Sequence, residues 1–178
     1  MRYVLFDNEC DAANSVAASG ERDWLANRSC GADNTHAGKV MDHVKYCAGY
    51  KFQVVEDYSV DVGFKPPLTV AVGEWVSLSD QGILTAKAGY AWDGASGPIE
   101  QTPDVIRGSL VHDCLYQLMR AGLLDQSYRE QADDVLKRIC IEDGMSHWYA
   151  QAIFYTVRAF GAPSAAVGAL PYPVLTAP

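Results

Sequence analysis

The sequence predicts an α+β fold with an irregular N-terminal segment, an antiparallel β-meander and then three packed α-helices. Residues 1–50 are rich in Asp, Asn, Ala, Ser and Gly, residues 51–92 alternate apolar with polar side chains, and residues 102–161 repeat apolar side chains at helical spacing. We therefore expect a loop-rich extension (1–50), one core domain (51–162) and an extended, proline-containing tail (163–178).

The β-meander is predicted over residues 51–92. Apolar and polar side chains alternate there with the period of half-buried strands, in the runs 52–54, 58–64, 68–72, 74–78 and 83–90. Pro66-Pro67 interrupts the alternation, and Ser79-Asp80-Gln81-Gly82 has the composition of a turn. An antiparallel meander of three to five strands is the natural interpretation.

Three helices are predicted within residues 102–161, each between a capping signal and a glycine. The starting signals are Thr102 before Pro103, the capping box Ser127-Tyr128-Arg129-Glu130, and Ser146. The ending signals are Gly122, Gly144 and Gly161. Apolar residues surround the first of these helices almost completely, which predicts that it is central and buried.

Composition excludes some classes of function. A net charge of −8 argues against nucleic-acid binding, which needs a basic face. No segment approaches the ~20 apolar residues of a membrane span, and the first residues do not resemble a secretory signal. The five cysteines are scattered and odd in number, which favours reduced thiols in a cytoplasm, although Cys114 and Cys140 could approach each other on neighbouring helices.

A histidine and a carboxylate on adjacent helices form the main candidate site. The segment His112-Asp113-Cys114-Leu115-Tyr116 places His112, Asp113 and Tyr116 within an arc of roughly 100° on the first helix. Asp133 borders the apolar face of the second helix and could orient His112, as general-base activation of water requires. The alternative is a structural polar network.

The two neighbouring aspartates on the second helix have different predicted partners. Asp134 points away from the apolar face and is expected to pair with Arg138 at i+4. If Asp133 has no catalytic role, it is expected to pair with Lys137.

Two further sets of residues have metal-ligand chemistry. In the loop 89–98, Asp93 and Gly94 could join Asp113 in a calcium site built from carboxylates and backbone carbonyls; the alternative is a tight turn with Trp92 in the core. The second set contains zinc-ligand types, but its spacing matches no standard finger: Cys30, His36, His43 and Cys47.

The stretch from Gly89 to about Gly161 resembles the phage and bacterial family called domain of unknown function 1353. The resemblance covers roughly 40% of the chain and implies a phage or prophage origin but no activity. The residues that carry it are Tyr90-Ala91-Trp92-Asp93-Gly94-Ala95-Ser96, His112-Asp113-Cys114-Leu115-Tyr116, Arg129 with Ala132-Asp133, and Val157-Arg158-Ala159-Phe160-Gly161.

A more distant resemblance links the two helices to the phospholipase A2 superfamily. The pattern His-Asp-x-x-Tyr followed by Ala-Asp on the next helix is similar to its short bacterial and parvoviral members. It implies that His112 is the base, Asp133 its partner, Asp113 a calcium ligand and Tyr116 a support. The family's Tyr-x-Gly-x-Gly loop and its flanking paired cysteines are absent here.

The resemblances lead to two expected functions. The first is a phage-encoded accessory or virion-associated protein of the tail or capsid, made in the host cytoplasm and binding phage structural proteins or copies of itself. The alternative is a calcium-dependent phospholipase A2-like esterase with a lipid substrate. Only the phage context would favour a third function, a peptidoglycan-directed hydrolase.

Overall fold

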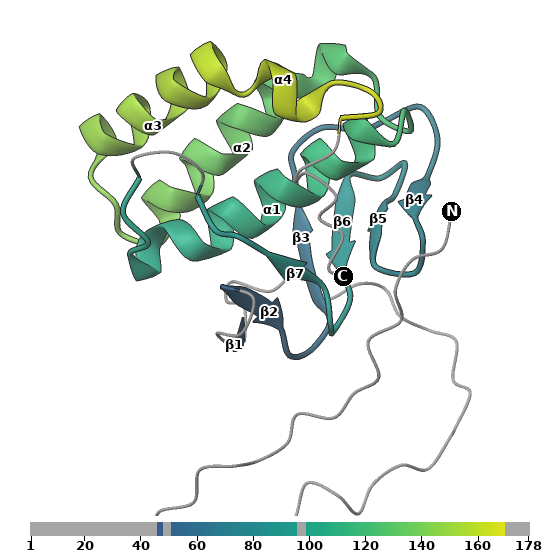
Figure 1. Cartoon of the computed structure of the whole chain (residues 1–178), viewed down its shortest axis with the longest axis horizontal. Coiled ribbons are helices and arrows are strands. Elements are labelled where there is room, and N and C mark those ends of the chain that lie inside the picture. Colours follow the sequence, from purple (N-terminus) through teal and green to yellow (C-terminus); the bar gives the residue numbers. More distant parts are fainter. Residues whose placement is uncertain (1–45, 48–50, 96–98, 170–178) are drawn as a thin grey trace, which may run out of the picture. The chain divides into compact units, whose positions relative to one another are not determined.

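The computed structural model describes residues 46–47, 51–95 and 99–169, with backbone alone for the first pair. All of them belong to the unit His36–Pro178. As predicted, an antiparallel β region precedes a set of packed helices (Figure 1). Of the predicted extension 1–50, residues 1–45 and 48–50 lie outside the described residues, and β1 shows that strand structure begins before residue 51.

The strands form two antiparallel sheets rather than one meander. The first has the order β1–β2–β7, with bounds Tyr46–Cys47, Phe52–Val54 and Ala91–Trp92. The second has the order β3–β6–β5–β4, with bounds Tyr58–Asp61, Ile83–Ala86, Val76–Leu78 and Val70–Val72. Only β4–β5–β6 is a true meander, because β3 returns to pair with β6.

Alternation of side chains explains the second sheet. Val60, Leu78 and Leu84 are buried, whereas their neighbours Ser59, Ser77 and Thr85 are only partly covered. The predicted strand 83–90 is wrong in its length, since it stops at Ala86 and a turn containing Gly89 separates it from β7. Local alternation gives the face of each strand but not the sheet to which it belongs.

The helices follow in the predicted order. They are α1 (Pro103–Arg120), α2 (Arg129–Glu142), α3 (His147–Phe160) and a one-turn helix α4 (Ala162–Ala165), with a 3₁₀ turn η1 (Gln126–Tyr128) before α2. α1 contacts β4, β6, α2 and α4, and most of its residues are buried, so it is the central helix that the sequence predicts. Among the described residues, no helix combines the length and apolarity needed to span a membrane.

The tail and the cysteines differ in part from expectation. Residues 162–165 form α4 where the sequence predicted the extended tail to begin, and residues 170–178 lie outside the described part. Cys114 and Cys140 are buried free thiols on α1 and α2. Burial raises the pKa of Cys140 to about 12 and raises that of Cys114 further, so both thiols are expected to be unreactive.

The predicted caps are confirmed in position for two helices and wrong for the third. Thr102 and Ser146 hold the N-cap positions of α1 and α3, although neither side chain makes a capping hydrogen bond. The capping box at Ser127 does not form. Instead, the Asp125 carboxylate accepts a hydrogen bond of 2.8 Å from the backbone N–H of Ser127 and begins η1, so α2 starts one residue later than the box requires.

This arrangement predicts unequal effects of two neighbouring substitutions. Asp125→Ala removes the carboxylate that caps η1 and is expected to lower the melting temperature by about 2–4 °C. Ser127→Ala keeps the backbone N–H that donates to Asp125 and removes only the hydroxyl, which also interacts with Asp125, so the loss should be smaller. Thermal unfolding followed by circular dichroism distinguishes the two. A larger loss for Ser127→Ala would restore the capping box as the start of α2.

Candidate functional site

His112 and Asp133 are brought together as the sequence predicts. His112 lies on α1 and Asp133 on α2, and the His112 Nε2 atom is 2.8 Å from Asp133 Oδ1. The contact depends on the close packing of the two helices, since Gly108 of α1 lies so near α2 that a Cβ there would be 3.0 Å from the Cys140 Sγ atom. Only 8% of His112 is exposed, and Asp133 is fully buried.

Asp133 accepts hydrogen bonds from α1 and α3 and forms an ion pair within α2. The Tyr116 hydroxyl of α1 donates to the same Oδ1 atom at 2.7 Å, and Arg158 Nη1 of α3 donates to Oδ2 at 2.9 Å. Arg129, one turn earlier on α2, lies 3.8 Å from Oδ2. The alternative pairing of Asp133 with Lys137 is therefore wrong, because Lys137 pairs with Asp134 instead. Asp134 is not paired with Arg138, which binds Glu142 and the backbone oxygen of Asp61.

The ionisation of Asp133 determines which histidine nitrogen carries a proton. Burial acts to raise the pKa of Asp133, but the hydrogen bonds from His112 and its other donors outweigh burial and hold the pKa below its usual range. An ionised carboxylate can only accept hydrogen bonds. His112 must therefore donate through Nε2–H, which leaves a lone pair on Nδ1 when the ring is neutral.

Tyr116 supports this geometry. Burial and the hydrogen bond to Asp133 raise the pKa of Tyr116, so its hydroxyl remains protonated and donating. Its ring lies against the His112 ring with a centroid distance of 4.0 Å. Gly161 makes room for the hydroxyl, since a Cβ at that position would be 2.7 Å from it. Tyr116 thus restricts the rotation of both His112 and Asp133.

Asp113 lies on the Nδ1 side of His112. The distance from His112 Nδ1 to Asp113 Oδ1 is 4.0 Å, too long for a hydrogen bond but close enough for electrostatic interaction. Burial raises the pKa of Asp113 to about 6, although the neighbouring His112 opposes the rise. The Asp113 side chain nevertheless keeps 29% of its surface exposed, so this side of the dyad is within reach of solvent.

Asp93 lies close to Asp113 but has a cation of its own. The charge of Asp93 contributes to the raised pKa of Asp113, so the two carboxylates share one electrostatic environment. Lys51 Nζ is 3.9 Å from Asp93 Oδ1, and its charge also acts on Asp113. A lysine ammonium therefore already stands beside the pair of carboxylates that the sequence predicts as calcium ligands.

The loop around Gly94 is organised by a side chain of this protein. Gln101 accepts a hydrogen bond from the Ala95 backbone N–H and donates one to the Ala95 carbonyl oxygen. Gly94 has a φ of +75°, and a Cβ there would lie 2.7 Å from Phe52 and against the Gln101 amide. Calcium needs six to eight oxygen ligands. Among the described residues, one loop carbonyl is engaged by Gln101 and a lysine lies beside Asp93, while residues 96–98 of the loop lie outside the described part, so the calcium site stays a prediction.

Trp92, beside Asp93, lies in the core, as the alternative interpretation of the loop as a tight turn predicts. Its side chain is buried in the core and its Nε1–H donates to the Ser109 hydroxyl on α1 at 3.1 Å, which joins the loop to the central helix. The predicted zinc-type set, made up of Cys30, His36, His43 and the side chain of Cys47, lies outside the described residues.

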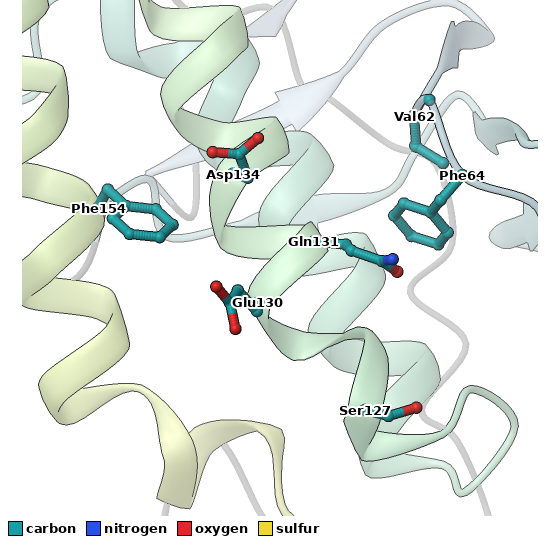
Figure 2. A pocket seen from close by; sticks show the side chains of 8 residues that line it. Val62, Phe64, Ser127, Glu130, Gln131, Asp134 and Phe154 are labelled. Atoms are coloured by element: carbon teal, nitrogen blue, oxygen red, sulfur yellow. The ribbon is translucent and has the colours of Figure 1, made fainter.

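A surface hollow of about 520 Å³ lies elsewhere and contains none of the predicted site residues. Figure 2 shows Phe154 of α3 on one side of α2 and Phe64 on the other. Lys137 pairs with Asp134 and lies over the Phe154 ring, 4.7 Å from its centroid, so a cation of this chain already interacts with the acidic rim. The residues that line the hollow are Val62, Gly63, Phe64, Ser127, Glu130, Gln131, Asp134 and Phe154.

Sequence reasoning assigned no role to the arginines around Asp133. Arg129 donates to the backbone oxygens of Val157 and Arg158 and so caps the end of α3, while the Arg158 guanidinium binds Asp133. The i, i+4 spacing of Arg129 and Asp133 on α2 was a local signal for their approach. The approach of Arg158 to Asp133 depends on how α3 packs against α2, and local sequence patterns do not predict this packing.

No family model, curated protein or solved structure is significantly similar to this chain. The resemblances to domain of unknown function 1353 and to the phospholipase A2 superfamily therefore stay predictions.

Proposed function

We propose that the protein is a hydrolase of ester bonds in which His112 is the general base. The observation that carries the proposal is the hydrogen bond of 2.8 Å between His112 Nε2 and the ionised Asp133, which leaves Nδ1 as the basic nitrogen. In many hydrolytic sites, a buried carboxylate binds one nitrogen of an imidazole, and the other ring nitrogen acts as the base.

The reaction needs no group that this chain lacks. His112 Nδ1 takes a proton from water while the water oxygen forms a bond to the ester carbonyl carbon. Asp133 stabilises the imidazolium that results, and Tyr116 and Arg158 keep the carboxylate in place. The imidazolium then returns the proton to the departing alcohol oxygen as the ester bond breaks. We assign no step to a bound cation.

Lipid esters are the substrate class that the resemblance to phospholipases favours. Partly exposed Asp113 marks the side of His112 from which an ester would approach, because it neighbours Nδ1. The nearby ammonium of Lys51 offers a positive charge to a phosphate or to a developing oxyanion.

The test measures fatty-acid release from phosphatidylcholine vesicles and the hydrolysis of a soluble short-chain ester, with calcium and with chelator. We expect hydrolysis under both conditions, reduced at least about 100-fold in His112→Ala. His147→Ala is the matched control, because His147 is an exposed histidine at the start of α3, and it should retain full activity. Absence of hydrolysis by the wild type, or equal rates for wild type and His112→Ala, would contradict the proposal.

A second candidate is the accessory or virion-associated role that the resemblance to domain of unknown function 1353 implies. The observation that favours it is the position of Asp133, which is fully buried and accepts hydrogen bonds from α1 and α3, as a structural clamp would. Under this alternative, His112→Ala is less stable than the wild type, and neither of these two proteins hydrolyses esters. The same pair of proteins therefore distinguishes the two candidates.

A further inference from the structure

The outer surface of α3 carries a stripe of exposed apolar residues. Trp148, Ala152, Tyr155 and Ala159 recur at helical spacing and fall within an arc of about 60°. All four are exposed, with 75% of Trp148 and 64% of Tyr155 accessible to solvent. We call these four residues the outer stripe. Figure 1 shows α3 on the outer side of the helices, next to α2.

The outer stripe is not needed for the core of the protomer. The opposite face of α3 supplies the packing through buried Ala150 and Ile153 and through Val157, which lies against the core. α3 is therefore apolar on two faces, and the residues that the structure describes cover only one of them. A helix of this kind is typically covered on both faces.

The charge pattern of the chain changes at this helix. All 22 acidic residues lie at or before Asp143, so α3 and the residues after it contain none. The one arginine of α3, Arg158, is directed to Asp133 rather than to the outer stripe. In a chain with a net charge of −8, the stripe is thus an uncharged surface on which two copies meet without like-charge repulsion.

The order of large and small residues makes the outer stripe complementary to itself. If two copies of α3 lie antiparallel about a twofold axis between residues 153 and 154, Trp148 faces Ala159 and Tyr155 faces Ala152 of the other copy. Each aromatic side chain then meets an alanine, which leaves space for it.

We propose that the outer stripe of α3 pairs with the same stripe of a second copy of this chain, as an antiparallel helix pair. This proposal is independent of the hydrolase and of the accessory role. A second copy is the occupant that the pattern specifies, because a lipid surface or an unrelated apolar partner requires no alternation of large and small residues. Fourteen residues of α3 span about 21 Å, so the dimer is expected to be weak.

Sedimentation velocity of the full chain between about 1 and 100 μM tests the proposal, since small interfaces dissociate in this range. The wild type is expected to shift from monomer to dimer, and Ala152→Glu to remain monomeric because it places a carboxylate against the aromatic ring of Tyr155 in the partner copy. Leu68→Glu is the matched control, because Leu68 is an exposed apolar residue far from α3 in the sequence, and it should dimerise as the wild type does.

A mixing experiment tests the register. Tyr155→Lys alone is expected to be monomeric, but a mixture with Ala152→Glu should form a heterodimer in which the introduced glutamate and lysine face each other. A monomeric wild type throughout the range would overturn the proposal, including the case in which it binds neutral lipid vesicles through α3. So would a dimer that Ala152→Glu leaves intact, or a mixture that forms no heterodimer.

Discussion

The Asp133→Ala variant is expected to lose about 3–5 kcal/mol of the free energy of unfolding. The substitution leaves Arg158 and His112 without the carboxylate that they bind, and it leaves the buried Tyr116 hydroxyl without an acceptor. Removing one partner from a buried charged network costs more than the network contributes, because the remaining groups stay desolvated. Urea unfolding followed by tryptophan fluorescence gives the free energy.

Asp134→Ala provides the control for this prediction. Asp134 follows Asp133 on the same helix, but its side chain is mostly exposed and pairs with Lys137 on the surface. Its removal is expected to change the free energy of unfolding by no more than about 0.5–1 kcal/mol. If the two alanine variants were equally stable, the network at Asp133 would contribute nothing to holding α1, α2 and α3 together.

The difference between these neighbours illustrates how much of the site could be predicted from the sequence. Helical periodicity alone distinguished Asp133 from Asp134, because one borders the apolar face of α2 and the other does not. The same argument placed His112 and Tyr116 on one side of α1. Since adjacent antiparallel helices bury facing polar groups together, their meeting with Asp133 was within reach of local patterns.

The arginines that surround Asp133 could not be predicted from local sequence patterns. Arg158 approaches Asp133 only because α3 returns along α2, and the angle and register of that packing depend on side chains from both helices. The partner of Asp134 also escaped prediction. Arg138 was available at i+4, yet it reaches across to the backbone oxygen of Asp61, a contact between segments far apart in the sequence.

Prediction of the fold from local sequence patterns was limited in a similar way. Alternation predicted which residues of β3, β5 and β6 face the core, and glycine and capping signals placed the helices to within a few residues. Division of the strands into two sheets depends on long-range pairing, in particular that of β3 with β6, which no local period encodes. At Gly94 the sequence indicated a tight loop but not that Gln101 would hold it.

Asp113 gives a prediction in which stability depends on pH. Burial raises the pKa of Asp113 to about 6, above the value of about 3.8 for an unfolded chain. Between these values the folded protein binds more protons than the unfolded one, so stability falls as pH rises from about 4 to 6 and remains lower above that range. Asp133 has the opposite effect, since its pKa is lowered and its contribution is lost as pH falls through the acid range.

Asp113→Asn should therefore stabilise the protein at pH 8 by about 1–3 kcal/mol, an estimate kept low because the side chain is partly exposed. The gain should shrink toward zero as the pH of the measurement approaches 4. Urea unfolding of both proteins across pH 4.5–8 measures it, with Asp134→Asn as a surface variant that removes the same negative charge. A gain that is constant over this range would show that the Asp113 carboxylate has an ordinary pKa.

The outcome for Asp113 also bears on function. A carboxylate that destabilises the fold at neutral pH, next to the basic nitrogen of His112, is an arrangement that packing alone does not require. If Asp113→Asn is more stable but hydrolyses esters more slowly, the carboxylate serves the chemistry of His112. If it is more stable and no ester is hydrolysed by the wild type, the raised pKa is a consequence of burial beside Asp93. The dyad would then be a structural element of the helix packing.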